Sequence, residues 1–409
     1  MSTPSELYRN AIDLNRFSNS VAKRIAVTYN DLVLDAVDRL RGIDELAAPA
    51  KAARLRAILA QLKQSLDGWA GTSTLAIVED LQGLAVLQSE FVANELRRAL
   101  PVELRRQIRS VQISPQFARS VATVDPTAIN VVSLSDNLQA AVAGAPQTFQ
   151  LTAAQGTTIT LPNGKVLEKS FRGLAESQAD LFAKTVRNGL LTGESADQIA
   201  RQLKGRLRFG QPGSLRQIAQ AGGQVTAAAN HQVNAMVRTS INQVANEASQ
   251  QVYKANQDVT RRYRYVATLD SKTSAICRAL DGQEFDYGKG PTPPQHFNCR
   301  STTVPVIDYS GLGIDPPPPS QLRRPNSAFK GTQAVRGQGV PDNETYGQWL
   351  DKQSMATKQD VLGKSKVPYF NRLVNKYGPT DAIRKFVNAD GSELTLEQLK
   401  DRYPNEQAA

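Results

Sequence analysis

Cysteine is scarce in this chain, with only Cys277 and Cys299 among 409 residues. Two cysteines cannot form the disulfide framework of a small secreted domain, so we expect the protein to be made in a reducing cytoplasm. No run approaches the roughly 18 consecutive apolar residues of a membrane-spanning helix. The N-terminus also lacks a basic stretch followed by an apolar one, and we therefore expect no signal peptide.

Acidic residues are outnumbered as well: 38 Asp and Glu stand against 49 Lys and Arg, which gives a formal net charge of +11. One cluster without any acidic residue consists of Arg201, Lys204, Arg206, Arg208 and Arg216. A second cluster is Arg261, Arg262 and Arg264. The overall excess of positive charge favours a polyanionic partner, either nucleic acid or an acidic protein surface. We predict that the first cluster contacts the phosphates of double-stranded DNA without sequence preference, and an acidic protein surface is the alternative partner.

The hydrophobic spacing predicts a mainly α-helical chain with a small α+β module. Hydrophobic residues make up 40% of the chain, which suffices for real cores in two or three domains. We expect five segments: an N-terminal helical region at 1–110, a β-rich, hairpin-containing insert at 111–170, a helical plus small-sheet module at 171–310, a Pro/Gly-rich linker at 311–340, and a C-terminal helical tail at 341–409.

In the first two segments the expected elements follow from periodicity and turn signals. Apolar residues recur at helical spacing from Ala22 to Leu40, and Gly42 ends that helix. Further helices are expected from Ala50 to Leu66 and from Ser73 to Leu100. In the insert, Asn163-Gly164 is a two-residue turn signal between expected strands at 159–161 and 165–167.

In the third segment, helices are expected from Leu174 to Gln257. Ser195 stands where an N-cap would, and Ile199 and Leu203 lie on the buried face of the following helix. We interpret this pattern as a packed helical hairpin, with the helix-turn-helix of a dedicated DNA-binding regulator as the alternative. A later apolar stripe predicts one central helix and consists of Val233, Val237, Ile241, Val244, Ala248 and Val252. Strands are expected at 263–268 and 302–307.

Between these two strands lies a turn-rich stretch, residues 267–301, which we call the Cys/His knot. Cys277, His296 and Cys299 can hold a structural Zn²⁺, whose preferred ligands are thiolates and imidazoles. A fourth ligand could come from Asp270 or Asp281. The alternative is that the cysteines are small buried hydrophobes and that His296 bonds a backbone carbonyl. Asp281-Gly282 reads as a turn, and Arg300 could clamp the knot by binding Asp270 or carbonyl groups.

With these residues, the chain resembles the phage Mu F-like minor head protein family, also called head morphogenesis proteins. The resemblance covers about residues 180–308 and rests on Arg238-Thr239, Asp270, Thr273, Cys277, Leu280-Asp281-Gly282, Pro294, His296, Cys299 and Arg300. Many members carry a cysteine where this chain has Ser274, and another where it has Ser301. Both replacements preserve side-chain shape and remove a metal ligand.

The resemblance implies a minor structural protein of a tailed-phage head, present in few copies in the virion. Its expected partners are the portal protein, the major capsid protein and packaged double-stranded DNA. Its expected places are the capsid interior and portal vertex, after assembly in the host cytoplasm. Its expected role is to aid head assembly, DNA packaging or genome ejection, and the C-terminal tail resembles extensions that such proteins carry.

An enzyme is the competing class, as a metal-dependent hydrolase or nuclease built on the Cys/His knot. Such an enzyme needs a base or nucleophile beside the metal. The sequence has no His-Glu-x-x-His pattern and no P-loop, and the only other histidine is His231. Asp270, Asp281 and Asp286 occur near the knot, but turn capping accounts for them. We therefore predict that the protein is not an enzyme.

Overall fold

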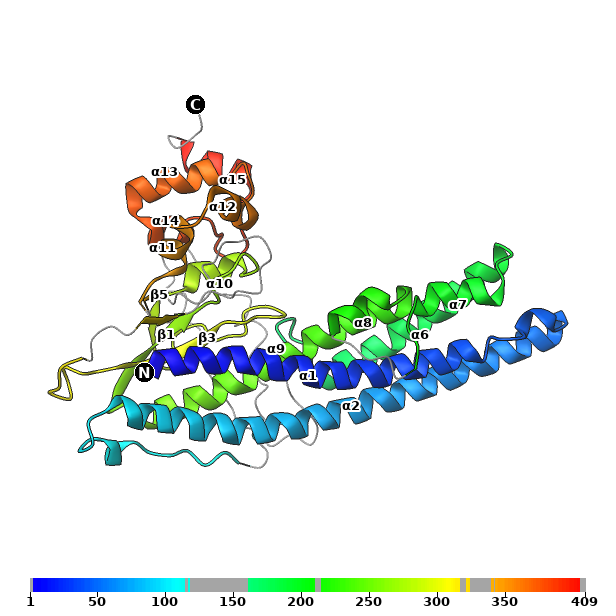
Figure 1. The fold of residues 1–409 in the computed structure, drawn as a ribbon, viewed down its shortest axis with the longest axis horizontal. Helices are drawn as coiled ribbons and strands as arrows, with labels where there is room; N and C mark the ends of the chain where they lie inside the picture. The colour runs from blue at the N-terminus through cyan, green and yellow to red at the C-terminus, as the bar shows by residue number, and fades with distance from the viewer. Residues whose placement is uncertain are drawn as a thin grey trace.

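The computed structural model describes residues 3–114, 117, 161–209, 215–316, 321–323, 340–341 and 343–404. Long helices form an extended arm, and a small sheet and a helical C-terminal module lie at the end of the arm nearest the N-terminus (Figure 1). The sheet has three antiparallel strands, and two further strands form a separate two-stranded sheet. The fold class predicted from the sequence, mainly α with a small α+β module, is confirmed. Within the described ranges, no helix combines the length and apolar character that crossing a bilayer requires.

The arm begins with a helical hairpin of α1 (Thr3–Asp38) and α2 (Ala48–Ala99), joined by the 3-10 turn η1 (Ile43–Glu45). Gly42 stands in the left-handed region with φ of 71°, but it directly precedes η1, and α1 already ends at Asp38, earlier than predicted. The predicted interruption between residues 66 and 73 is wrong, because α2 runs through it as one helix. Trp69 is buried there against Tyr29 and Phe171, and this packing outweighs the weak helix propensity of the neighbouring glycines.

The second half of the arm consists of α6 (Leu167–Leu191), α7 (Ala196–Lys204), α8 (Leu215–Ala221) and α9 (Gln224–Ala255). The central helix is α9, which packs against α1, α2 and α6. The predicted central stripe is confirmed, since every one of its side chains is buried: Val233, Val237, Ile241, Val244, Ala248 and Val252. The stripe therefore forms the common core of the four-helix bundle.

The predicted hairpin around Asn163-Gly164 is only half correct. The turn exists, because the Leu161 amide donates to the Lys165 carbonyl at 2.9 Å and Gly164 has φ of 73°. The second predicted strand is wrong, since α6 begins at Leu167. Leu167, Phe171 and later apolar residues recur at helical spacing and are buried, so the helix hides more surface than a strand would. The remaining strand signals of the insert lie outside the described residues, which resume at 161.

The sheet has the order β2-β1-β3, with β1 (Thr260–Val266) between β2 (Glu284–Asp286) and β3 (Thr302–Ile307). Tyr263 of β1 lies opposite both Phe285 and Pro305. The strands expected at 263–268 and 302–307 are confirmed to within a few residues, whereas the three-residue β2 was not predicted. The short helix α10 (Ala275–Leu280) lies between β1 and β2 along the chain.

The C-terminal module, residues 343–404, is helical as predicted. It consists of α11 (Tyr346–Asp351), α12 (Met355–Leu362), α13 (Val367–Tyr377), α14 (Pro379–Arg384) and α15 (Leu396–Arg402). Its core includes Tyr346, Trp349, Phe370 and Phe386, together with Leu269 of the Cys/His knot. The expected linker is not wholly without structure, because β4 (Gln321–Arg323) pairs with β5 (Val340–Pro341).

Alanine substitutions at two glycines of the arm are expected to change the free energy of unfolding in opposite directions. A methyl group at Gly223 would collide with the Gln202 carbonyl and the Gly205 amide, whereas nothing lies within 4 Å of one at Gly68. We expect Gly223→Ala to lower the free energy of unfolding by about 1–3 kcal/mol. Gly68→Ala should raise it by up to about 1 kcal/mol, because alanine favours a helix interior. Urea denaturation measures both, and shifts in the same direction would contradict these packing assignments.

Candidate metal centre

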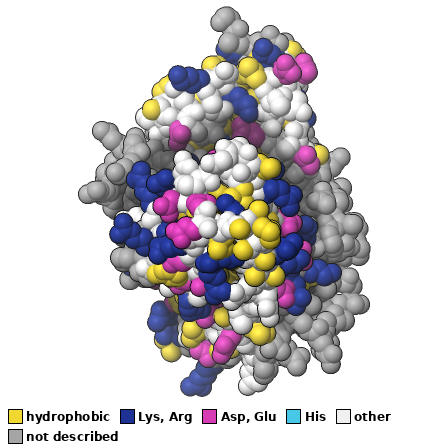
Figure 2. All heavy atoms as spheres, turned by 90° about the vertical axis from the view of Figure 1, so that its right-hand side faces the viewer, with side chains coloured by type: hydrophobic (Ala, Val, Ile, Leu, Met, Phe, Trp, Pro, Cys, Tyr) yellow, Lys and Arg dark blue, Asp and Glu magenta, His cyan; other side chains and the backbone are white. Residues whose placement is uncertain are grey.

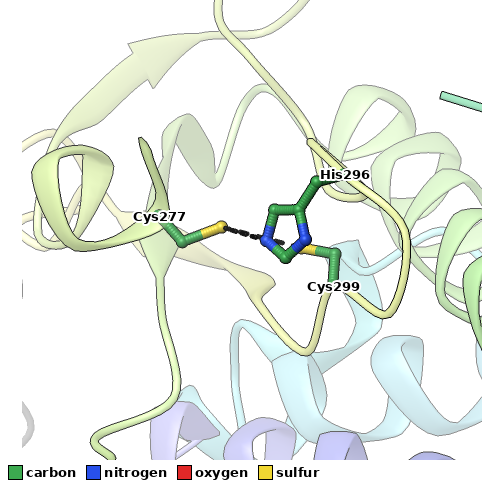
Figure 3. Close-up of side chains that lie close together, drawn as sticks. All are labelled: Cys277, His296 and Cys299. Atoms are coloured by element: carbon green, nitrogen blue, oxygen red, sulfur yellow. Dashed lines mark hydrogen bonds between the residues drawn. The ribbon is translucent and has the colours of Figure 1, made fainter. Parts of the chain in front are cut away.

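Three potential metal ligands meet in the Cys/His knot (Figure 3). Cys277 comes from α10, and His296 and Cys299 come from the segment that leads into β3. The two sulfur atoms are 3.7 Å apart, and the His296 Nε2 atom lies 3.3 Å from the Cys277 Sγ. Both cysteines are free thiols and almost fully buried. The structure thus brings together the three residues whose types and spacing predicted a zinc site.

Local structure explains this convergence. Ser274 caps α10 by accepting a bond from the Cys277 amide, and this cap sets the first turn on which Cys277 lies. On the other side, the Cys299 amide donates to the His296 carbonyl at 3.1 Å. Asn298, between them, has φ of 60°, a conformation that asparagine tolerates better than most residues. The resulting tight turn directs both side chains at Cys277.

The geometry of the three ligand atoms fits a tetrahedral zinc ion. Zinc–ligand bonds of about 2.3 Å to sulfur and about 2.0 Å to nitrogen imply separations of roughly 3.8 Å between sulfurs and roughly 3.5 Å between sulfur and nitrogen. In the structure the two sulfurs are 3.7 Å apart, and the Cys277 Sγ and His296 Nε2 atoms are 3.3 Å apart. His296 Nδ1 lies 2.8 Å from the Phe297 carbonyl oxygen, which can only accept a hydrogen bond. That bond leaves Nε2 available to a metal, the usual arrangement at zinc histidines.

The protonation of the three groups is coupled. Burial raises the pKa of the Cys277 thiol well above its usual value, and Cys299 adds to this rise. Burial acts in the same direction on Cys299, but the neighbouring Cys277 and His296 outweigh it and hold the Cys299 pKa well below its usual value. Burial alone would lower the pKa of His296, yet the pKa is raised because Cys299 lies beside the ring. Cys299 is therefore the thiol that ionises first.

Tyr265 is a member of this site that the sequence reasoning missed. Its ring is fully buried, and its hydroxyl lies 3.2 Å from the Cys277 sulfur and 4.0 Å from the Cys299 sulfur. Desolvation keeps the pKa of this phenol well above its usual value, so it is a neutral hydroxyl. The alternating pattern of the strand could have indicated that Tyr263 and Tyr265 share a buried face, but not what that face meets.

Asp270 and Arg300 form the clamp that the sequence predicted. The Arg300 guanidinium binds the Asp270 carboxylate through two bonds, of 2.5 and 2.8 Å. Asp270 also accepts from the Lys272 amide at 2.9 Å and from the Thr273 hydroxyl at 3.1 Å. A buried carboxylate with this many donors holds the turn together. It is not a member of the Cys/His group, which comprises Cys277, His296 and Cys299.

Asp281, the other expected fourth ligand, is also not part of that group. One carboxylate oxygen accepts from the Ala267 amide at 2.6 Å and the other from the Tyr346 amide at 2.5 Å. Tyr346 opens α11, so Asp281 ties β1 to the first helix of the C-terminal module. Gly282, with φ of 76°, makes the predicted turn. The role of this Asp-Gly pair in holding the module was not foreseen, because the partner lies 65 residues away.

Replacing Asp281 with asparagine tests that role. The Asp281→Asn amide turns an N–H donor toward one of the two backbone amides, which leaves a buried donor unsatisfied. We expect a loss of about 1–3 kcal/mol in the free energy of unfolding. We also expect protease cleavage to rise between residues 308 and 346 before the bundle unfolds. An unchanged melting curve together with unchanged cleavage would contradict this assignment.

The two residues of the Arg238-Thr239 pair on α9 contact different parts of the molecule. The Thr239 hydroxyl accepts a bond of 3.0 Å from the Asn298 amide, so it supports the closing turn of the Cys/His knot. Arg238 instead binds the Asn19 side chain of α1, with its Nε atom at 3.1 Å. One dipeptide thus joins the knot to α9 and α9 to α1.

The two basic clusters of the sequence differ in the structure. The arginines of β1 are neutralised: Arg261 pairs with Asp308, Arg262 with Asp286 and Arg264 with Glu284. In the first cluster, Arg201 and Lys204 lie on α7, and Arg206 and Arg208 follow it and are exposed. The backbone of Arg216 belongs to α8, but its side chain lies outside the described part.

The helix start at Ser195 is confirmed. The Ser195 hydroxyl accepts from the Gln198 amide in a full capping box. Ile199 and Leu203 are buried in the bundle core, and α7 packs against α1, α6 and α9. This is the packed arrangement that we preferred over a helix-turn-helix reader.

Comparison with known proteins agrees with the motif residues. Residues 180–304 match the family model described as "Phage Mu protein F like protein". The search of curated proteins and the search of solved structures found no match. The matched range contains α7, α8, α9, β1, the Cys/His knot with β2, and the first half of β3. This part of the chain is therefore similar to the phage Mu F-like family, the head morphogenesis family that the sequence resembles.

Proposed function

We propose that this protein is a minor structural component of a tailed-phage head, located at the portal vertex or in the capsid interior. The match of residues 180–304 to the phage Mu F-like family carries the proposal. Its proposed partners are the portal protein and the major capsid protein, and its proposed role is to aid head assembly, DNA packaging or genome ejection. The long helical arm, with α2 alone extending roughly 78 Å at 1.5 Å per residue, is suited to bridging between such partners.

A structural role also suits the chemistry of the Cys/His knot better than catalysis does. A hydrolytic zinc keeps an open coordination position and a base beside it. Here the thiols are buried, and the hydroxyl in contact with them belongs to a buried tyrosine. The nearby carboxylates of Asp270 and Asp281 already bind Arg300 and backbone amides. We therefore propose that the protein is not an enzyme.

For the metal, we propose that Cys277, His296 and Cys299 hold a structural zinc ion. When bound, zinc would supply a cross-link between α10 and the segment that leads into β3. Tyr265 would donate a hydrogen bond to the Cys277 sulfur, and the Phe297 carbonyl would orient the imidazole. The residues of this chain thus provide three ligands and their supporting hydrogen bonds.

We also propose that the arm contacts packaged double-stranded DNA through phosphates. Arg201, Lys204 and Arg206 support this, because among the described residues no carboxylate forms an ion pair with them. Phosphate contacts release counterions, so the affinity should fall steeply with salt and be indifferent to sequence, in the range of about 10⁻⁴–10⁻⁶ M. These values set the conditions for the binding test described below.

A conditional mutant of the parent phage tests the head role. With a stop codon early in this gene, a non-permissive host should yield no infectious particles. Electron microscopy should then show heads that are malformed, empty, or filled but not infectious. These three results correspond to a failure of head assembly, of DNA packaging and of genome ejection, respectively. A normal yield of infectious particles would overturn the proposed function.

A further inference from the structure

A hollow of about 130 Å³ lies between the end of α1 and the whole length of α7. Its floor is apolar, with Val37 and Leu40 on one side and Ala196 and Ala200 on the other. Its rim is charged and consists of Asp38, Arg41, Asp197, Arg201 and Lys204. One water molecule takes up about 30 Å³ of liquid, so the hollow has room for a group the size of a phosphate.

Three cationic side chains surround this hollow, and they come from two parts of the sequence. Arg201 and Lys204 are one turn apart on α7, whereas Arg41 follows α1. Arg41 pairs with Asp38 at 3.2 Å, but its side chain remains 75% exposed, so the pair is weak and can share its donors. Asp197, the other acidic side chain of the rim, forms no ion pair with a side chain of the described residues, and its charge opposes the binding of an anion.

Further charged side chains lie around the hollow. Figure 2 views the molecule toward the far end of the arm, where Lys and Arg side chains, with Asp and Glu among them, surround an apolar patch. Arg54 of α2 donates to the carbonyls of Arg39 and Arg41, at distances of 3.0 to 3.2 Å. This bond places a further cation beside the chain that carries Arg41.

We propose that the hollow between α1 and α7 binds one backbone phosphate of double-stranded DNA, held by Arg41 from one side and by Arg201 and Lys204 from the other. The inference rests on the DNA contact proposed above and deepens it: it names the group that is bound and adds Arg41, which lies far from the basic cluster in sequence. A guanidinium pair suits this task, because its planar donors match phosphate oxygens.

The test compares two double variants with the same change in net charge. Arg41→Gln with Arg201→Gln alters the hollow, and Arg261→Gln with Arg262→Gln removes two ion-paired arginines of β1. Binding of the full chain to an unrelated 30-base-pair duplex is titrated across a salt series. We expect the first variant to reduce the slope of log affinity against log salt by about 0.9, the value for one phosphate. The second variant should keep the wild-type slope.

A third variant is expected to gain affinity, a result that loss of folding could not produce. Asp197→Asn removes the opposing charge, and we expect it to strengthen duplex binding by about two- to fivefold. If both double variants lowered the salt slope equally and Asp197→Asn did not raise the affinity for the duplex, the proposed phosphate site in the hollow would be overturned. The DNA contact would then be diffuse. Absence of duplex binding by the wild type at low salt would instead overturn the DNA contact itself, in favour of an acidic protein partner.

Discussion

An Ile241→Asp variant is expected to be insoluble or unfolded, with a loss of about 3–5 kcal/mol in the free energy of unfolding. Ile241 is 2% exposed and lies in the core that α9 shares with its neighbouring helices. An aspartate there would have to bury an unpaired charge or bind a proton at a cost. Because single domains are stable by only about 5–15 kcal/mol, this loss removes a large part of the margin, and at the lower end of that range it removes most of it.

Gln232→Asp is the matched control. It lies on the same helix, introduces the same side chain and is exposed. We expect it to change the free energy of unfolding by less than about 0.5 kcal/mol. Circular dichroism and urea denaturation measure both variants. A soluble, fully folded Ile241→Asp protein would show that the stripe on α9 is not the centre of the bundle.

The second large expected effect is the loss of stability when metal is removed from the Cys/His knot. Purified protein is expected to contain about one zinc ion per chain by elemental analysis, and a chelator should lower its melting temperature. A ligand present at a thousand times its dissociation constant stabilises the folded state by about 4 kcal/mol, so its removal should cost a similar amount. Cys299→Ala and His296→Ala should each lose the metal and most of its stabilisation.

His231→Ala serves as the control, because His231 is the only other histidine and is exposed on α9. It should retain the metal and the response to chelator. Hydrogen exchange should rise across residues 261–308 in the Cys299→Ala and His296→Ala proteins and stay unchanged in the control. If purified wild-type protein contained no metal and its stability did not change with chelator, the alternative would hold. In that alternative, hydrogen bonds alone hold the three side chains.

The parts of the fold that the sequence predicted are those that local chemistry determines. Apolar residues at helical spacing identified α9, and the hydroxyl of Ser195 identified the start of α7. The types and spacing of Cys277, His296 and Cys299 identified the candidate metal centre. In each case the signal lies within one helix or one short segment, so no knowledge of distant contacts is needed.

The parts that were missed depend on contacts between distant segments. Weak helix formers around Trp69 predicted a break in α2, but burial of that side chain by α1 and α6 keeps the helix continuous. Asp281 looked like a metal ligand because nothing in its own segment showed that the Tyr346 amide would take one oxygen. The sequence also did not show that the basic run on β1 is neutralised, because its partner carboxylates, such as Asp308, lie elsewhere in the chain.

The most direct test of the head role is a count of this chain in purified heads. Quantitative mass spectrometry should measure it against the portal and major capsid proteins, in wild-type heads and in heads assembled without the portal. The proposal predicts a few copies per head, in a fixed ratio to the portal, and loss of the chain when the portal is absent. Absence from purified heads, or an amount that follows the major capsid protein regardless of the portal, would contradict it.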